Sequence, residues 1–395
     1  MSKLDELIQE LCPDGVEYRK LEDCCTVLDK KRKPVTKAAR EAGEYPYYGA
    51  NGIQDYVSDY IFDGTFVLVG EDGSVITKAG TPVVTWAEGK IWVNNHAHII
   101  EETDGVLLRY LFHYIQTIDV TPLIHGNIPK LTGGDFRALQ IPVPPLPVQS
   151  EIVRILDNFT ELTAELTAEL TARKKQYEYY HNVLMDFSGE DIEYRSVGEL
   201  FEIKNGLNKE KAAFGKGQPI INFTDVYNKR WLANGSFSGL VDVSVDEIER
   251  YSAKKGDVFF TRTSETKEDV GMSSTLIEDV PNCVFSGFVL RARPTTNLLL
   301  PKFCSYYFST NKVRDTIVRY AAFTTRATTT GPKLSKISVP ILPIEKQQQI
   351  VDILDRFDAL SNDISYGLPA EIEARQKQYE YYRDKLLTFK EVAAT

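Results

Sequence analysis

Two histidines stand two positions apart in the sequence, at His96 and His98. In a β-strand, side chains at this spacing share one face, and two imidazoles on one face are a recurring part of zinc sites. No third ligand is evident in the sequence, and the two residues before the pair are Asn94 and Asn95. We therefore favour a polar strand edge over a metal site and predict that the chain holds no metal.

Other patterns that carry chemistry are weak or absent from the sequence. GEDG at 70–73 places two adjacent carboxylates in a turn, which is a weak signal for acid–base catalysis. There is no Walker A, GxSxG or HExxH pattern, and the only adjacent prolines, Pro144 and Pro145, lack the Asn or Asp of an Asn/Asp-Pro-Pro-aromatic motif. The five cysteines include no CxxC pair, which argues against a disulfide framework and a zinc site. The sequence predicts a non-catalytic chain with no cofactor of its own.

The elements that position these residues occur twice along the chain. Residues 173–180 read RKKQYEYY and residues 375–382 read RQKQYEYY. The openings VEYRKLEDC at 16–24 and IEYRSVGEL at 192–200 are also alike. A spacing of about 200 residues is too long for a solenoid or propeller repeat, whose periods are roughly 20–50 residues. The chain is therefore predicted to consist of two homologous halves.

A proline-rich hinge and an apolar helix precede each octamer. The segments are IPVPPLPVQSEIVRILDNF at 141–159 and ISVPILPIEKQQQIVDILDRF at 337–357. Matching Pro144 to Pro340 aligns the hinges, and a two-residue insertion then matches Ile152 to Ile350. Apolar residues at steps of three and four predict one helix from Val148 to Phe187 and a second that begins near residue 350. The two helices are expected to pack antiparallel about a pseudo-twofold axis, with a break near Gly367 and Pro369 in the second.

The octamers predict a surface for a protein partner. Both copies repeat the same polar residues beside a tyrosine, which an apolar core alone does not explain, although a purely structural hairpin accounts for the apolar stripe. The expected docking residues are Lys175, Gln176, Tyr177, Lys377, Gln378 and Tyr379.

The two variable blocks between these elements read as mixed β structure with some helix. Strand-like runs are GTFVLVG at 64–70, TPVVTWA at 81–87, AHIIEE at 97–102, GDVFFTR at 256–262 and NCVFSGFVLRARP at 282–294. We align GTFVLVGEDG with GDVFFTRTSE, and GNIPKL at 126–131 with TTGPKL at 329–334. The blocks are thus predicted to share a fold and to differ in their loops.

Charge is distributed unevenly between the blocks. The whole chain has a net charge of −10, but residues 196–340 hold 20 Lys and Arg against 15 Asp and Glu, whereas residues 20–141 hold 12 against 16. Total charge does not exclude nucleic acid, since only the face that touches phosphate has to be positive. Arg and Lys suit guanine, and Asn and Gln suit adenine. The side chains in loops or beside Gly, Ser or Thr that we expect at such a contact are Lys31, Arg32, Asn51, Gln54, Lys78, Asn95, His125 and Lys130 in the first block and Lys204, Asn205, Arg262, Ser264, Lys267, Arg326 and Lys333 in the second.

Taken together, these features resemble the specificity (S) subunits of type I restriction–modification enzymes. The resemblance rests on the two-half layout, the VPxLP hinges, the IVxILDxF and KQYEYY helices and the tandem TAEL within residues 160–173, which is similar to a subfamily with variable spacer repeats. It implies an α+β fold of two homologous mixed α/β target recognition domains separated by two long antiparallel coiled-coil helices. The expected boundaries are 1–145 and 189–340 for the recognition domains and 146–188 and 341–390 for the helices.

The resemblance also implies a function and partners. Each domain would read half of a bipartite site in double-stranded DNA, and the helices would set the gap and dock two methyltransferase subunits and up to two restriction subunits. S-adenosylmethionine, ATP and Mg²⁺ would belong to those partners. The acidic, amphipathic start of the chain and the lack of a long apolar run favour a cytoplasmic protein without membrane contact. The alternatives are a coiled-coil protein–protein scaffold that reads no DNA, and a stand-alone enzyme with an unrecognised site.

The TAEL tandem has the geometry of an adjustable spacer. Four helical residues add roughly 6 Å and about 40° of rotation. One base pair of B-DNA adds about 3.4 Å and roughly 35°. One more TAEL would then rephase two DNA-reading units by about one base pair, although replication slippage in a tolerant helix also accounts for the tandem.

Overall fold

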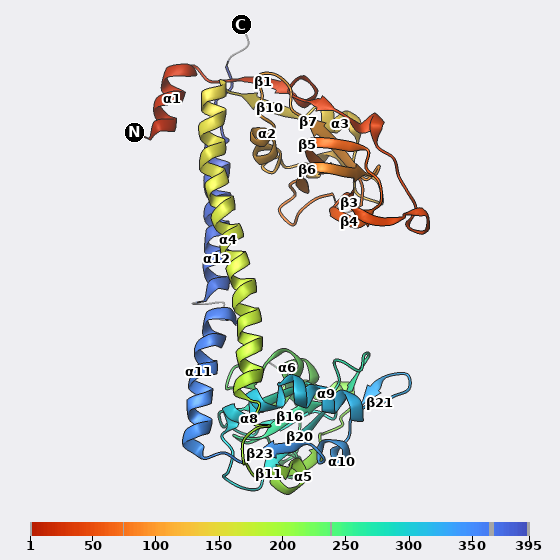
Figure 1. Cartoon of the computed structure of the whole chain (residues 1–395), viewed down its shortest axis with the longest axis vertical. Helices are drawn as coiled ribbons and strands as arrows, with labels where there is room; N and C mark the ends of the chain where they lie inside the picture. Colours follow the sequence, from red (N-terminus) through yellow and green to blue (C-terminus); the bar gives the residue numbers. More distant parts are fainter. Residues whose placement is uncertain (1, 74, 238, 363–366, 393–395) are drawn as a thin grey trace. The chain divides into compact units, whose positions relative to one another are not determined.

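The computed structural model describes residues 2–73, 75–237, 239–362 and 367–392, and it leaves out the side chains of residues 125, 361 and 362. The chain divides into two compact units (Figure 1). Unit 1 consists of Met1–Ala168 and Glu371–Thr395, and unit 2 of Glu169–Ala370. Each unit therefore contains one variable block together with helical segments from both halves of the sequence.

The sheet of unit 1 has six strands in the order β2-β7-β5-β6-β3-β4. Its central strand β5 is buried on both faces, because Val67 and Val69 enter one hydrophobic core while Phe66 and Leu68 enter another. Burial on two faces explains why the sequence of this strand is a continuous apolar run. The strands are β2 (Thr26–Val27), β3 (Ala42–Gly49), β4 (Gly52–Val57), β5 (Phe62–Gly70), β6 (Val84–Val93) and β7 (Ala97–Glu101).

The main sheet of unit 2 repeats this order as β12-β20-β16-β18-β14. Its strand β16 pairs antiparallel with β18 and β20, as β5 pairs antiparallel with β6 and β7. Val258 and Phe260 enter one core and Phe259 the other. The strands are β12 (Phe201–Asn205), β14 (Trp231–Leu232), β16 (Val258–Thr261), β18 (Ser273–Leu276) and β20 (Val289–Pro294). The predicted correspondence of 64–73 with 256–265 fits this topology.

A short strand pair stands before the long helix in each unit. β1 (Glu17–Lys20) pairs with β10 (Gln140–Val143), and β11 (Tyr194–Ser196) pairs with β23 (Ser338–Pro340). Tyr18 lies opposite Pro142 and Tyr194 opposite Pro340, so the equivalent prolines are 198 positions apart. The helices α4 and α11 begin at Leu146 and Ile344, again 198 apart. The predicted match of Pro144 to Pro340 with a two-residue insertion is therefore wrong.

A β-hairpin followed by a short helix comes just before β10 and β23. In unit 1 these are β8 (Ile124–His125), β9 (Lys130–Leu131) and α3 (Gly133–Arg137), and in unit 2 they are β21 (Ala322–Phe323), β22 (Ala327–Thr328) and α10 (Gly331–Leu334). The N-caps of the two helices are Thr132 and Thr330. This register corrects the predicted alignment of 126–131 with 329–334, since the segment equivalent to 126–131 is 324–329.

The long helices contribute to both units. α4 (Leu146–Leu184) has 39 residues, and α11 (Ile344–Asn362) and α12 (Leu368–Leu386) have 19 each. In unit 1, α4 packs against α12, where the rings of Phe159 and Tyr382 lie 5.4 Å apart. In unit 2 it packs against α11, with Tyr180 and Phe357 5.6 Å apart. In each unit the paired helices run in opposite directions, as predicted (Figure 1).

Two equivalent helices pack on the main sheets. α2 (Leu108–Ile115) in unit 1 and α8 (Pro301–Phe308) in unit 2 are equivalent, and each packs on its sheet. Within the described residues, no helix is both long enough and apolar enough to cross a bilayer. The remaining elements are α1 (Lys3–Leu11), α5 (Val197–Leu200), α6 (Phe223–Asn228), α7 (Val245–Arg250), α9 (Asn311–Tyr320), β13 (Phe214–Ile221), β15 (Leu240–Val241), β17 (Thr263–Ser264) and β19 (Val284–Phe285), besides five short 3-10 turns.

Candidate nucleic-acid interface

Three segments of unit 1 meet where the central strand β5 ends. The amide of Glu71, the first residue after β5, donates to the carbonyl of His96 at 2.8 Å. The carbonyl of Glu71 accepts from the amide of Leu131 in the β8–β9 hairpin, also at 2.8 Å. The end of β5, the turn before β7 and the hairpin are thus joined by backbone hydrogen bonds. We name this place the strand-end face of unit 1.

The same three segments meet in unit 2. The amide of Arg262, the first residue after β16, donates to the carbonyl of Phe288 at 3.0 Å. The carbonyl of Arg262 accepts from the amide of Thr329, beside the β21–β22 hairpin, at 3.0 Å. Arg262 therefore occupies the place of Glu71, and Phe288 that of His96. The strand-end face of unit 2 has the same backbone connections with different side chains.

The turn that carries Phe288 is held on three sides. The carbonyl of Phe288 is bonded to Arg262, and the next amide, that of Val289, donates to Ser286 at 3.1 Å. The amide of Gly287 donates to Leu207 at 2.7 Å. Gly206 permits this approach, because a Cβ there would lie 2.1 Å from the carbonyl oxygen of Ser286. The backbone of the turn is therefore fixed, and the side chain of Phe288 projects from it with 65% exposure.

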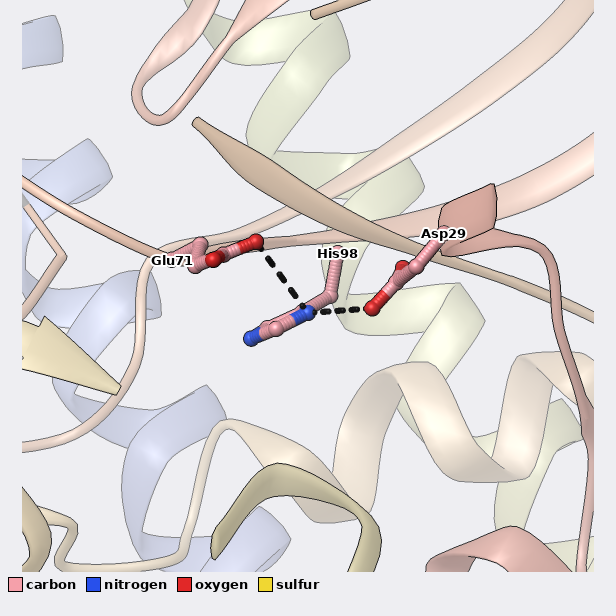
Figure 2. Close-up of side chains that lie close together, drawn as sticks. All are labelled: Asp29, Glu71 and His98. Atoms are coloured by element: carbon pink, nitrogen blue, oxygen red, sulfur yellow. Dashed lines mark hydrogen bonds and ion pairs between the residues drawn. The ribbon is translucent and has the colours of Figure 1, made fainter. Parts of the chain in front are cut away.

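Buried charges fill the strand-end face of unit 1. His98 is fully buried, with Nδ1 2.7 Å from Asp29 Oδ2 and Nε2 3.0 Å from the carbonyl oxygen of Leu131 (Figure 2). Its ring stacks on Phe136 at 4.3 Å. Burial raises the pKa of Asp29, but the hydrogen bonds from His98 and the Ile99 amide outweigh it, so the pKa is lowered. Asp29 is therefore a carboxylate that holds His98 in one orientation.

Asp29, Glu71 and His98 lie close enough together to hold a cation (Figure 2). The chain's own cations occupy this position instead. Arg32 Nη1 lies 2.6 Å and Lys130 Nζ 3.1 Å from Glu71, and Arg137 approaches Asp29 at 3.6 Å. Three cations thus surround two carboxylates, and a metal ion would meet their repulsion. We interpret the cluster as a structural ion network.

The predicted pairing of the two histidines on one strand face is wrong. His96 precedes β7 and lies in a turn, where its ring bonds to Asp72 and remains 48% exposed. His98 points into the core. The alternation expected within a strand does not apply, because the strand begins only at Ala97.

The predicted DNA-contact residues of the first block have different environments. Arg32 is only 12% exposed and bonds to Glu71 and to the carbonyl of Ala97. Lys130 pairs with Glu71, and Asn95 is exposed in the turn beside His96. Elsewhere, Lys31, Asn51, Gln54 and Lys78 are exposed, with Gln54 accepting from Asn94, and the side chain of His125 lies outside the described residues. A DNA contact at each of these residues stays a prediction.

In the second block, the predicted residues gather more closely. Arg262, Ser264 and Lys267 follow β16, and Arg326 lies in the β21–β22 hairpin. Arg262, Lys267 and Arg326 are exposed, and in the part of the chain that the structure describes their side chains form no ion pair or hydrogen bond. Lys204 and Asn205 lie in β12, and Lys333 lies in α10. The cations of unit 2 are thus free to meet an anion, whereas Arg32 and Lys130 of unit 1 are neutralised.

A cleft of about 430 Å³ adjoins these residues of unit 2. Ser264, Phe288 and Arg326 line it, together with the stacked rings of Phe223 and Tyr227, whose centroids are 5.6 Å apart. The sequence pattern does not single out Phe288, because the run 282–294 predicts one continuous strand. The Ser-Gly pair before it is the turn signal that was available.

Two buried glutamines join the variable blocks to the long helices. Gln347 of α11 accepts from the amide of Leu300 at 2.8 Å and donates to the carbonyls of Leu298 and Leu342 at 2.7 and 2.8 Å. Gln149 of α4 makes the equivalent three bonds in unit 1, including one from the Leu107 amide at 2.9 Å. Leu107 and Leu300 are the N-caps of α2 and α8 and lack a side-chain cap of their own. Each glutamine thus fixes the start of the helix that covers the sheet.

Aspartates eight residues after the glutamines, about two helical turns further along, make a second pair of anchors. Asp157 accepts from Arg109 Nε at 2.7 Å and from His113 Nε2 at 2.9 Å. Asp355 in unit 2 accepts from Lys302 Nζ and the Tyr306 hydroxyl, both at 2.6 Å. These anchors, like the glutamines, were not identified from the sequence, although both pairs are identical residues 198 positions apart.

The octamer residues are divided between surface and core. Lys175, Gln176, Lys377 and Gln378 are exposed, and Lys377 pairs with Glu373 on the same helix. Tyr177 and Tyr379 are buried. Tyr177 stacks on His181 and lies under Arg230, and the Tyr379 hydroxyl bonds to His113 Nδ1 at 3.0 Å. The tyrosines therefore contact their own units, and partner docking at all six residues stays a prediction.

Comparison with known sequences identifies the family. The description "Type I restriction modification DNA specificity domain" matches residues 13–173 and 189–374. The chain belongs to this family of type I specificity subunits. A putative type I specificity subunit of Haemophilus influenzae is 36% identical over 394 residues, covering 95% of this chain and 96% of that protein. The EcoR124I/EcoR124II specificity subunit of Escherichia coli is 34% identical over 299 residues, with 73% and 72% coverage.

Solved structures from type I restriction–modification systems have the same fold. A type I restriction–modification S subunit from M. genitalium aligns with a TM-score of 0.53 at 14% identity, covering 94% of this chain and 96% of that one. A chain from a study of complex assembly and conformational transition in a type I system aligns with a TM-score of 0.61, also at 14% identity, with 96% and 98% coverage. The prediction of two mixed α/β target recognition domains linked by long helices is confirmed, as is that of a non-catalytic DNA specificity subunit.

Proposed function

We propose that each target recognition domain reads one half of a bipartite site in duplex DNA through its strand-end face. The observation that supports this proposal is the equivalence of the two faces. The backbone connections of Glu71 and Arg262 are the same, while their side chains differ in charge. A fixed frame that carries changeable side chains is what two readers of different half-sites require.

The helix pair is proposed to set the gap between the half-sites, as in the subfamily with variable TAEL repeats. Support comes from the exposure of the tandem at 160–173, where no side chain is fully buried. The hydroxyls of Thr163 and Thr167 bond to the carbonyls of Phe159 and Thr163, four residues earlier, at 2.8 and 2.7 Å. These two bonds lie within α4 itself.

The partners are proposed to be two methyltransferase subunits and up to two restriction subunits. The exposed Lys175, Gln176 and Gln378 offer polar groups for docking. S-adenosylmethionine, ATP and Mg²⁺ would be held by those subunits, which would methylate and cleave the DNA. The assembly would act in the cytoplasm, together with the DNA that it reads.

Sequencing of methylated adenines tests the proposal. The complete chain is produced with its methyltransferase subunits in a host that lacks other adenine methylation. A bipartite motif with a fixed gap is the expected result. A gel shift at matched salt must then show tighter binding of that motif than of a scrambled duplex. Binding that is equal for both duplexes, with assembly intact, would favour the protein–protein scaffold.

Variants of the two faces separate the reading of the half-sites. Arg262→Gln should alter the motif in one half only, and Lys130→Gln, if it alters anything, should alter the other half. A shared change in both halves would contradict the assignment of one half-site to each domain.

A further inference from the structure

We propose that Phe288 determines specificity in the second target recognition domain by contacting the C5-methyl group of a thymine in the major groove. The inference rests on the proposed function, because it assigns a base contact within the strand-end face of unit 2. The strand-end face of unit 2 would bind duplex DNA, and Phe288 would recognise a group that only thymine presents among the four bases.

The placement of Phe288 distinguishes it from an incidental surface residue. Single exposed apolar residues are common on proteins and by themselves indicate nothing. Phe288, however, is 65% exposed on a turn whose backbone is held by Arg262, Leu207 and Ser286. A rigid turn presents the ring in one position without further loss of backbone entropy on binding.

The surroundings of the ring favour DNA over an apolar partner. Phe288 forms one wall of the cleft, and Ser264 and Arg326 form others. Arg262 is the first residue after the central strand, and its amide donates to the carbonyl of Phe288 in the turn. Neither guanidinium is paired within the described residues, so both can meet a phosphate backbone. Glu265 and Asp269 also line the cleft, and the Asp269 carboxylate accepts from the hydroxyls of Tyr227 and Thr266.

The shape of the site favours a methyl contact over intercalation. Side chains that wedge between bases have to project beyond their neighbours. Phe288 is exposed, but it lines a concave space of about 430 Å³ whose walls also include Ser264, Arg326, Glu265 and Asp269. A thymine edge offers an apolar methyl group beside a carbonyl acceptor, which matches an aromatic wall beside Ser264 and Arg326.

The first domain supplies an internal comparison. His96 occupies the place of Phe288 there, and its ring is bonded to Asp72. A polar ring held by a carboxylate does not offer an apolar surface to a methyl group. The two domains should therefore differ in their response to removal of a thymine methyl group.

Replacement of thymine by deoxyuridine removes only that methyl group and tests the proposal. The complete chain is assembled with its methyltransferase subunits, and the probe is a duplex with the bipartite motif found by adenine sequencing. Each thymine on either strand is replaced in turn. At one position of one half-site, deoxyuridine should weaken binding by about fourfold, the effect of leaving one methyl group unburied.

Variants of the chain decide whether Phe288 is the residue responsible. Phe288→Ala and Phe288→His should bind the thymine and deoxyuridine duplexes equally at that position, whereas Phe288→Leu should retain a difference. The matched control is Val245→Ala, because Val245 is 72% exposed in the same domain but lies on α7, outside the cleft. It should respond as the unaltered chain does.

The proposal is overturned if no thymine of the motif shows a methyl effect, or if the effect persists in Phe288→Ala. It is also overturned if Phe288→Ala abolishes unstacking of a 2-aminopurine probe without changing the response to deoxyuridine, since that result indicates intercalation. Absence of any bipartite preference in the unaltered complex is a different result, and it would contradict the proposed function itself.

Discussion

Replacement of Gln347 by alanine should destabilise unit 2 and leave unit 1 intact. Gln347 is completely buried at the second turn of α11, and its amide group is bonded to three backbone groups on two segments. One of them is the amide of Leu300, the N-cap of α8. Alanine removes the side-chain amide that bonds to all three backbone groups, and it leaves a space that the surrounding backbone fills only in part.

The magnitude follows from the burial of the three backbone groups. The bond to Leu342 is fully buried, and an unsatisfied group there should cost about 1–3 kcal/mol. The groups of Leu298 and Leu300 are partly accessible, so water replaces part of each lost bond, and about 0.5–1.5 kcal/mol is lost for each. The three losses add to about 2–6 kcal/mol, and in the lower half of that range the free energy of unfolding of unit 2 should fall by about 3 kcal/mol.

Hydrogen–deuterium exchange followed by mass spectrometry measures this loss in each unit separately. Peptides from the sheet of unit 2 should exchange about 100-fold faster in Gln347→Ala, since each 1.4 kcal/mol is a factor of about ten. The control is Gln348→Ala, whose side chain is exposed and, among the described residues, bonds only to Asp352 four residues on. Gln149→Ala should have the mirror effect and accelerate exchange in unit 1.

Two results would refute this reasoning. If Gln347→Ala and Gln348→Ala differ by less than about 1 kcal/mol, the buried bonds do not contribute as argued. If both units lose protection equally in Gln347→Ala, the glutamine does not act through the recognition domain that it contacts.

Three further predictions concern DNA binding, spacing and pH. Arg262→Gln combined with Arg326→Gln should lower the slope of log K against log salt by about one to two, and Lys255→Gln, which lies outside the cleft, should not. Insertion of one TAEL after Leu170 should widen the gap in the methylated motif while both half-sites and the melting temperature stay unchanged; altered half-sites would contradict the separation of reading from spacing. Burial lowers the pKa of His181 to about 4, so the unfolded chain takes up a proton first as the pH falls below about 6.5. Unit 2 should therefore lose about 2 kcal/mol between about pH 7 and pH 5, a loss that urea unfolding of His181→Gln should not show.

The architecture could be predicted from the sequence because it is repeated and periodic. The octamers at 173–180 and 375–382 fix the two halves, and the apolar positions fix α4 over nearly its whole length. The break in the second helix was also predictable, since α12 begins at Leu368, immediately before Pro369. These features depend on neighbours within a few residues, which is the range over which sequence patterns are informative.

The side-chain environments could not be predicted in the same way, because they depend on contacts between distant residues. Arg32 was chosen as an exposed cation, yet its partner Glu71 is 39 residues away and comes close only in the folded sheet. Matching the hinges by their prolines gives the wrong alignment of Pro144 with Pro340. The strand pairing of Tyr18 with Pro142 gives the correct one, in which Pro142 is equivalent to Pro340. Gln149 and Gln347 are an exception, because the same polar residue occurs at the equivalent position of both amphipathic helices. Burying a glutamine is unfavourable unless the protein itself supplies its hydrogen-bond partners.

The two halves of the sequence repeat do not coincide with the two compact units of the structure. The first octamer ends the first half of the sequence, but Tyr177 is buried in unit 2, and Tyr379 of the second octamer is buried in unit 1. The last helical segment of each half thus packs in the unit that holds the recognition domain of the other half. In unit 2 the chain continues directly from that helix into β11, whereas in unit 1 the same junction is made without a covalent link.

Hydrogen bonds take the place of that link. The amide of Val16 donates to the carbonyl of Lys390 at 2.8 Å, and the amide of Val392 donates to the carbonyl of Val16 at 3.1 Å. The Tyr18 hydroxyl also bonds to the carbonyl of Phe389 at 3.2 Å. Because the core of each recognition domain includes residues from the other half of the sequence, we expect that one copy of either half alone leaves the core of its own domain incomplete.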